Sequence, residues 1–251
     1  MGDVEVRTEV AAGVAVLTVS NPARRNAMNL GLSRMLSDAV AAAVADPVVG
    51  AVVVTGEPPA FCAGGDLEEL ATADPDVLRA VYAGFLSVAA CPLPTIAAVN
   101  GAAVGAGMNL ALAADLRLAG PQARFDTRFL PLGLHPGGGY TWMVQRAVGS
   151  QAAAALTLFG DVVDAAEAER IGLVYRAVDD VVGSAVEMGA RAAANPRELI
   201  VTTKASMRLA ANLATQAEAV EIEVRAQAAS IRSETFRERL AALQARITGR
   251  G

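Results

Sequence analysis

Histidine and cysteine are scarce in this sequence of 251 residues, which has one histidine, His135, and two cysteines, Cys62 and Cys91. Two thiols are too few for a disulfide framework, and together with a single imidazole they provide almost no ligands for a metal ion. The sequence therefore predicts no metal site, and it is typical of a protein that folds in a reducing cytosol.

Positive charge is also in short supply, because 21 Lys and Arg residues stand against 26 Asp and Glu residues and give a net charge of −5. No run of basic residues offers a local field for a phosphate backbone, so we expect no nucleic-acid partner. The opening residues lack the basic and apolar segments of a secretory signal, so we also expect no leader peptide.

Charged residues are absent between Arg79 and Asp115, a stretch that could cross a membrane on length alone. Prolines, asparagines and glycines interrupt it, among them Pro94, Asn100 and Gly105. In lipid, the backbone groups freed at these breaks would have no partners. We therefore expect buried core here and no membrane partner.

Short apolar runs alternate with helical periodicity in the first half of the chain. Such alternation is typical of a layered α/β domain, which is the fold class we predict. Two β-rich stretches, 4–8 and 14–20, are separated by Ala-Ala-Gly and predict a strand–turn–strand unit. Apolar runs of strand length occur at 51–55 and 95–99, and helical spacing of apolar residues occurs at 32–43 and 76–90.

Helical periodicity dominates from about residue 139 onward, where only 174–178 resembles a strand. Near the end, apolar faces would need to pack on the body of the protein or on a neighbouring subunit. We therefore predict a core domain over 1–195 and a helical oligomerisation region over 196–251. The apolar faces comprise Leu209, Leu213, Val220, Val224, Ile231, Leu240, Leu243 and Ile247.

Two glycine-rich segments, 61–67 and 100–109, each lead from an expected strand into an expected helix. Glycine lets the backbone approach a ligand, and the first N–H groups of a helix have no partner within it. The pair therefore predicts two free backbone donors for an oxyanion. Each segment alone is equally well an ordinary strand-to-helix turn, with Asp66 as a helix cap. Neither has the context of an NAD or ATP motif.

Further motifs follow one another along the chain. Together with 61–67 they are Asn21-Pro22 to Asn29, Pro94 to Gly107, Ala114-Asp115-Leu116-Arg117, Leu132-Gly133-Leu134 and Pro136-Gly137-Gly138-Gly139. In this order and at these spacings they resemble the crotonase superfamily, also called the enoyl-CoA hydratase/isomerase family, over essentially the whole chain.

The resemblance implies a spiral core of repeated ββα units with a C-terminal helical trimerisation region. Members assemble as trimers or as dimers of trimers, so a homo-oligomer is expected. Members bind acyl-CoA thioesters, which implies coenzyme A as part of the substrate and no permanently bound cofactor.

Carried over by position, the resemblance assigns the two oxyanion-hole N–H groups to Gly65 and Ala106. It places Arg24 and Arg25 near the phosphates of coenzyme A, although a solvated pair of arginines is an alternative. The remaining contacts, along the adenine and pantetheine or lining the pocket, are Ala63, Gly65, Asp66 and Leu67.

Hydratases of this family use two glutamates to position and activate water, and these positions hold Asn109 and Phe129 here. A further acidic position of related isomerases falls on Gly137. Asparagine cannot exchange a proton near neutral pH and phenylalanine cannot hydrogen-bond, so ordinary hydration loses both its groups. Enolate chemistry at the oxyanion hole is therefore expected; the alternatives are a non-catalytic acyl-CoA binder and a purely structural role.

Other side chains could carry a proton in place of the glutamates. His135 follows Phe129 by six residues and has a suitable ordinary pKa of roughly 6.5, although it could equally be a hydrogen-bonded loop histidine. Asp66 and Asp126 are weaker candidates, because the first is expected to cap a helix and the second to pair with Arg128. Phe129 and Trp142 are expected to fill apolar space.

Overall fold

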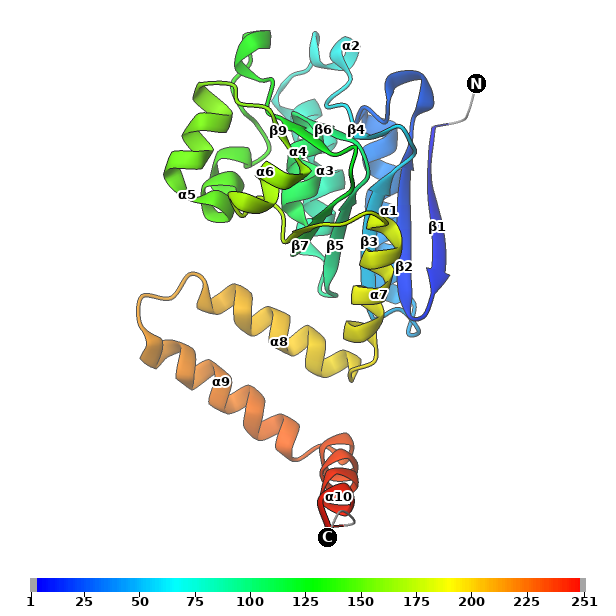
Figure 1. Ribbon diagram of the computed structural model, residues 1–251, viewed down its shortest axis with the longest axis vertical. Coiled ribbons are helices and arrows are strands. Elements are labelled where there is room, and N and C mark those ends of the chain that lie inside the picture. The colour runs from blue at the N-terminus through cyan, green and yellow to red at the C-terminus, as the bar shows by residue number, and fades with distance from the viewer. Residues whose placement is uncertain (1–3, 249–251) are drawn as a thin grey trace. The chain divides into compact units, whose positions relative to one another are not determined.

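Valine- and alanine-rich segments form the strands of two sheets in the computed structural model, which describes residues 4–248 (Figure 1). The larger sheet has the order β1 (Glu5–Ala11), β2 (Val14–Ser20), β3 (Ala51–Gly56), β5 (Thr95–Val99), β7 (Leu116–Ala119) and β10 (Arg176–Ala177). The smaller sheet has the order β4 (Ala60–Cys62), β6 (Ala102–Val104), β8 (Arg124–Asp126) and β9 (Val163–Asp164).

From β3 to β8, successive strands alternate between the two sheets. Strands β1 and β2 pair antiparallel, which confirms the predicted strand–turn–strand unit, whereas β3, β5, β7 and β10 are parallel to their neighbours. Each of the pairs β3–β4, β5–β6 and β7–β8 advances one position in both sheets before the chain returns through a helix. The predicted α/β spiral of ββα units is therefore confirmed.

Helices connect these pairs and cover the larger sheet. Helix α7 packs on the face formed by alternate residues of the strands, including Val14, Val53 and Ala98, and in Figure 1 α1 lies behind the same sheet. The helices of this part are α1 (Leu30–Ala45), α2 (Leu67–Leu70), α3 (Pro75–Ala90), α4 (Ala106–Ala113), α5 (Tyr140–Leu158), α6 (Ala165–Arg170) and α7 (Val181–Ala193), with 3₁₀ turns η1 (Pro22–Arg24) and η2 (Leu130–Leu132).

The uncharged stretch between Arg79 and Asp115 forms most of α3, all of β5 and β6, and α4. Every residue of β5 is buried, as are residues 107–113 of α4. A Cβ placed on Gly107 would lie 2.1 Å from the carbonyl oxygen of Cys62, so only glycine lets α4 pack this closely on β4. Among the described residues, no helix is long and apolar enough to span a membrane.

Several short strands differ from the sequence expectation. Residues 102–104 were expected within a turn but form β6, and the strand expected at 174–178 is reduced to the two residues of β10. Strands β4, β8 and β9 were not predicted. Strands of two or three residues are too short to show a period of two, so only their neighbours in the sheet reveal them.

The chain divides into two compact units, Met1–Ala193 and Ala194–Gly251, whose outermost residues 1–3 and 249–251 lie outside the described range. The second unit consists of α8 (Arg197–Ala210), α9 (Gln216–Ile231) and α10 (Glu234–Thr248). A capping box formed by Thr215 and Glu218 starts α9. The apolar side chains of this second unit are largely exposed in the single chain, including Val224 of α9, which is 52% exposed, and Ile247 of α10, which is 66% exposed.

Candidate active site

A cavity of about 870 Å³ lies in the first unit and is lined by both glycine-rich turns. This volume is in the range of ligand-binding pockets. Helix α3 forms one wall, and the chain between β8 and α5 contributes another. The lining residues from these elements include Ala63, Gly64, Gly65 and Leu67 of the first turn, Gly105, Ala106 and Asn109 of the second, Leu78, Val81, Tyr82 and Phe85 of α3, and Phe129, His135 and Gly137.

The first turn, between β4 and α2, is held by backbone hydrogen bonds on both sides of Gly65. The Met28 N–H donates to the Gly64 carbonyl at 2.7 Å, and the Asp66 N–H donates to the Met28 carbonyl at 2.8 Å. Gly64 has a φ of +117°, a conformation that favours glycine. The Gly65 N–H itself donates to no acceptor within residues 4–248.

The second turn, between β6 and α4, is built in a similar way. The Gly105 N–H donates to the Asp126 carbonyl at 2.9 Å, and Gly105 has a φ of +50°. Ala106 is the first residue of α4, so its N–H has no acceptor within the helix, and none is found elsewhere in the described residues. Both amides assigned from the sequence are thus available on one cavity.

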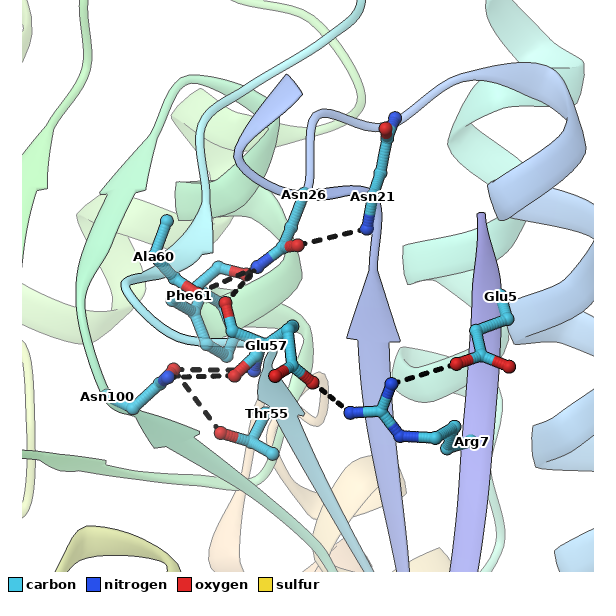
Figure 2. Close-up of polar contacts among 10 residues, drawn as sticks. Glu5, Arg7, Asn21, Asn26, Thr55, Glu57, Ala60, Phe61 and Asn100 are labelled. Carbon is cyan, nitrogen blue, oxygen red and sulfur yellow. Dashed lines mark hydrogen bonds and ion pairs between the residues drawn. The ribbon is translucent and has the colours of Figure 1, made fainter. Parts of the chain in front are cut away.

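Two buried or half-buried asparagines hold the segments that lead into β4 and β6, the strands that precede these turns (Figure 2). Asn26 donates to the carbonyls of Glu57 at 2.7 Å and Ala60 at 2.8 Å, and its own oxygen accepts the Asn21 N–H at 3.0 Å. Asn100 donates to the Gly56 carbonyl at 2.8 Å. These bonds position the segments that enter the first and second turns.

Asn109 is buried on α4, and its side chain is already engaged. Its Nδ2 donates to the Gly137 carbonyl at 2.8 Å, while its Oδ1 is buried without a hydrogen-bond partner. Phe129 lines the cavity, and its ring lies 5.3 Å from that of Tyr140 between centroids. Neither side chain offers an ionisable group to a bound substrate.

The candidate proton carriers differ in how they are held. His135 is exposed at the cavity, with its Nδ1 2.7 Å from the Pro136 carbonyl oxygen. Asp126 is buried in the cavity wall and forms the expected ion pair with Arg128. Asp66 caps α2 by accepting from the Glu68 and Glu69 N–H groups, and it is not among the residues that line the cavity.

The one thiol beside the site is inert near neutral pH. Burial raises the pKa of Cys62 to about 11, so it stays protonated and is a poor nucleophile. Within residues 4–248, no group of three or more His, Cys, Asp or Glu side chains could hold a metal ion.

Positive charge is concentrated at the cavity although the chain is acidic overall. Arg25, Arg124 and Arg128 line it, against Asp126 as the one acidic residue of the lining. Arg25 and Arg124 form no ion pair within the described residues. Arg24 does not line the cavity; its guanidinium pairs with Glu68 at 2.7 Å. The free charges favour an anionic ligand.

The environment of Trp142 differs from the prediction, and two residues that line the cavity were not predicted. Trp142 was expected to fill apolar space, but it is 56% exposed and the Arg146 guanidinium lies 3.8 Å from its ring centroid. Tyr82 and Arg124 line the cavity and were not singled out. Arg124 begins β8 two residues before Asp126, on the same face of that strand, but a strand of three residues gives no signal in the sequence that would place either residue.

Comparison with known proteins gives a consistent result over nearly the whole chain. The profile of the enoyl-CoA hydratase/isomerase family matches residues 9–246. A probable enoyl-CoA hydratase of Mycobacterium tuberculosis is 53% identical over 243 residues, which cover 93% of this chain and 94% of that protein.

Solved structures agree with this result. The crystal structure of an enoyl-CoA hydratase from Polaromonas sp. JS666 superimposes with a TM-score of 0.90 at 28% identity, covering 96% of this chain and 97% of that one. An enoyl-CoA hydratase from Bacillus anthracis gives a TM-score of 0.87 at 26% identity, covering 98% and 96% of the two chains.

Proposed function

The chain belongs to the enoyl-CoA hydratase/isomerase family, and from this premise we propose that its cavity binds an acyl-CoA thioester and stabilises the enolate of the acyl group. The observation that carries the proposal is the pair of free amides, those of Gly65 and Ala106, on one cavity. Two preorganised donors aimed at a thioester oxygen stabilise the charge that develops there, and one such donor typically contributes about 3 kcal/mol.

The charge of the cavity supports a coenzyme A ligand, whose phosphates are anionic. Arg25 follows η1 and lines the cavity beside the first turn, together with Ala63 and Leu67. We assign the phosphate contact to Arg25 rather than Arg24, because the Arg24 guanidinium is paired with Glu68. We also propose that the adenine and pantetheine of the ligand lie along Ala63, Gly65 and Leu67.

Proton transfer at C2 of the acyl group, rather than ordinary hydration of a double bond, is the reaction proposed. Asn109 and Phe129 provide no carboxylate to activate water, whereas His135 lines the cavity with one ring nitrogen free of the bond to Pro136. A histidine exchanges protons near neutral pH and needs no second acid to do so.

A non-catalytic acyl-CoA binder is the second candidate. It is favoured by the state of the acidic side chains, because Asp126 is paired with Arg128 and Asp66 is committed to a helix cap. Such a protein would use the two amides for recognition alone.

We further propose that the chain assembles as a trimer or a dimer of trimers through its C-terminal helices. The exposed apolar side chains of α9 and α10, including Val220, Leu240 and Leu243, support this proposal. Light scattering should find no stable monomer at micromolar concentration, and a folded monomer with full ligand binding would contradict it.

Thermal shift and isotope exchange test the proposed function together. Coenzyme A and butanoyl-CoA should raise the melting temperature by mass action, whereas NAD and ATP should not. Incorporation of solvent deuterium at C2 of butanoyl-CoA then reports catalysis.

The variant His135→Ala separates the two candidates. If it abolishes exchange but keeps the affinity for butanoyl-CoA, His135 is the proton carrier. Binding without any exchange in the unmodified protein supports the binder, and stabilisation by NAD with none by acyl-CoA overturns both.

A further inference from the structure

Tyr82 brings a hydroxyl group to the cavity wall formed by α3, whose other lining residues are apolar. It lies half-buried on α3 and lines the cavity, and its ring centroid lies 5.6 Å from that of Phe85. The hydroxyl has no hydrogen-bond partner within residues 4–248. Its neighbours on α3 in the cavity lining, Leu78, Val81 and Phe85, offer it none.

The hydroxyl is tightly placed against the loop before α5. A Cβ placed on Gly137 would lie 2.3 Å from the Tyr82 oxygen, so the hydroxyl occupies the space that any side chain at position 137 would take. The Gly137 carbonyl accepts the amide of Asn109, which lies on α4 less than one turn after Ala106. Tyr82, Gly137 and Asn109 thus form a continuous wall that leads to the oxyanion amides.

Burial raises the pKa of Tyr82, so this group is protonated near neutral pH and can donate a hydrogen bond. An alkyl chain that fills this part of the cavity would displace water from the hydroxyl and would offer it no hydrogen-bond acceptor in return. An acyl chain with an oxygen at this point would restore the bond. Sites with a polar group of this kind discriminate strongly between ligands that satisfy it and ligands that do not.

We propose that Tyr82 is a specificity-determining residue that selects acyl-CoA thioesters bearing a hydrogen-bond-accepting oxygen on the acyl chain, with the Tyr82 hydroxyl as donor to that oxygen. The proposal rests on the proposed function, because it takes the cavity to be the acyl site. It involves hydrogen bonding only, and no bond is made or broken at Tyr82.

The test compares affinities within pairs of ligands of equal chain length. Butanoyl-CoA and hexanoyl-CoA are measured by calorimetry against hydroxy- and oxo-substituted forms of the same chains, with the oxygen placed at successive carbons. In the unmodified protein we expect one substituted form to bind about tenfold more tightly than its parent, the discrimination typical of one satisfied hydrogen bond.

Tyr82→Phe is the decisive variant because it removes only the hydroxyl. The preference should fall to within about twofold, with the parent ligand binding as well as before or better. Tyr175→Phe is the matched control, because Tyr175 is exposed and does not line the cavity. It should keep the preference, and a preference that survives in Tyr82→Phe would overturn the proposal.

Gly137→Ala provides a second route to the same result. Its methyl group would meet the hydroxyl and displace it, so the preference should be lost while Tyr82 is still present. Combining it with Tyr82→Phe should cause little further loss, since both act on one contact.

Failure of this inference differs from failure of the proposed function. If acyl-CoA thioesters bind but no substituted form is preferred, only the role of Tyr82 is refuted. If neither coenzyme A nor any acyl-CoA binds, the proposed function itself is refuted.

Discussion

The two sides of the cavity differ in the polar groups that remain free to bind a substrate. On one side, the turns at Gly65 and Ala106 present amides without acceptors, and Asn26 holds the chain that enters the first of them. On the other side, Asn109 is bonded to Gly137 and the remaining space holds Phe129 and Tyr82. One side therefore offers free backbone donors, whereas Asn109 and Phe129 on the other offer no ionisable group, and the proposed function rests on this contrast.

The largest expected effect concerns hydration of crotonyl-CoA by the unmodified protein. Each positioned acid or base typically contributes about 10² to 10⁴ in rate, and we take Asn109 and Phe129 to stand where a hydratase has both. Turnover should therefore be several orders of magnitude below that of an ordinary hydratase, as followed by loss of the enoyl absorbance. Hydration at ordinary enzyme rates would show that the side of the cavity with Asn109 and Phe129 does not lack a group that activates water.

Ala106→Pro removes one amide donor from the first side. Ala106 is the first residue of α4, a position at which proline is tolerated, so the helix should form without the N–H. Deuterium exchange at C2 should fall by about 10² to 10³. Gln216→Pro, also at a first helical position but in α9, is the control and should leave exchange unchanged.

Adding carboxylates to the second side should restore part of the hydration. Asn109→Glu combined with Phe129→Glu should raise crotonyl-CoA turnover by about 10², and more than either change alone, because two carboxyls act on one water. The structure limits the gain, since Asn109→Glu replaces a donor to the Gly137 carbonyl with a second acceptor. A single change that equals the double variant would contradict this account.

Asn26→Ala should weaken the scaffold that supports the first side. The buried side chain bonds to the backbone of Asn21, Glu57 and Ala60, so these groups lose their partners. We expect the free energy of unfolding to fall by about 3 kcal/mol in urea denaturation. Asn212→Ala, which removes one exposed hydrogen bond, should cost less than about 1 kcal/mol.

The smallest expected effect is a pH dependence of stability. The folded protein holds the proton of Cys62 up to about pH 11, whereas the unfolded chain releases it near pH 9.0, the ordinary value for a solvated thiol. Stability is therefore full below about pH 9 and falls as the pH rises toward about 11, by about 1.4 kcal/mol for each pH unit. Cys62→Ala should flatten this part of the curve, and an unchanged slope would show that the thiol is not protected.

Periodicity alone predicted the layered α/β class, because the interior strands and helices are long enough to show their periods, whereas the repeated ββα unit was implied only by the family resemblance. Segments 51–55 and 95–99 became β3 and β5, and 76–90 became α3 with one added residue. The short strands β4, β6 and β8 were not predicted, although they form most of the smaller sheet, beside which the cavity lies. Their pairing depends on partners that are distant in sequence.

What the sequence determined by itself is local chemistry: the two glycine turns, the family motifs and the absence of acids at positions 109, 129 and 137. What only the tertiary structure decided is which groups remain free. Arg24 is paired while Arg25 is not, and Tyr82 lies against Gly137. The physical reason is that a side chain's availability depends on contacts between separate elements, which neither its identity nor its spacing encodes.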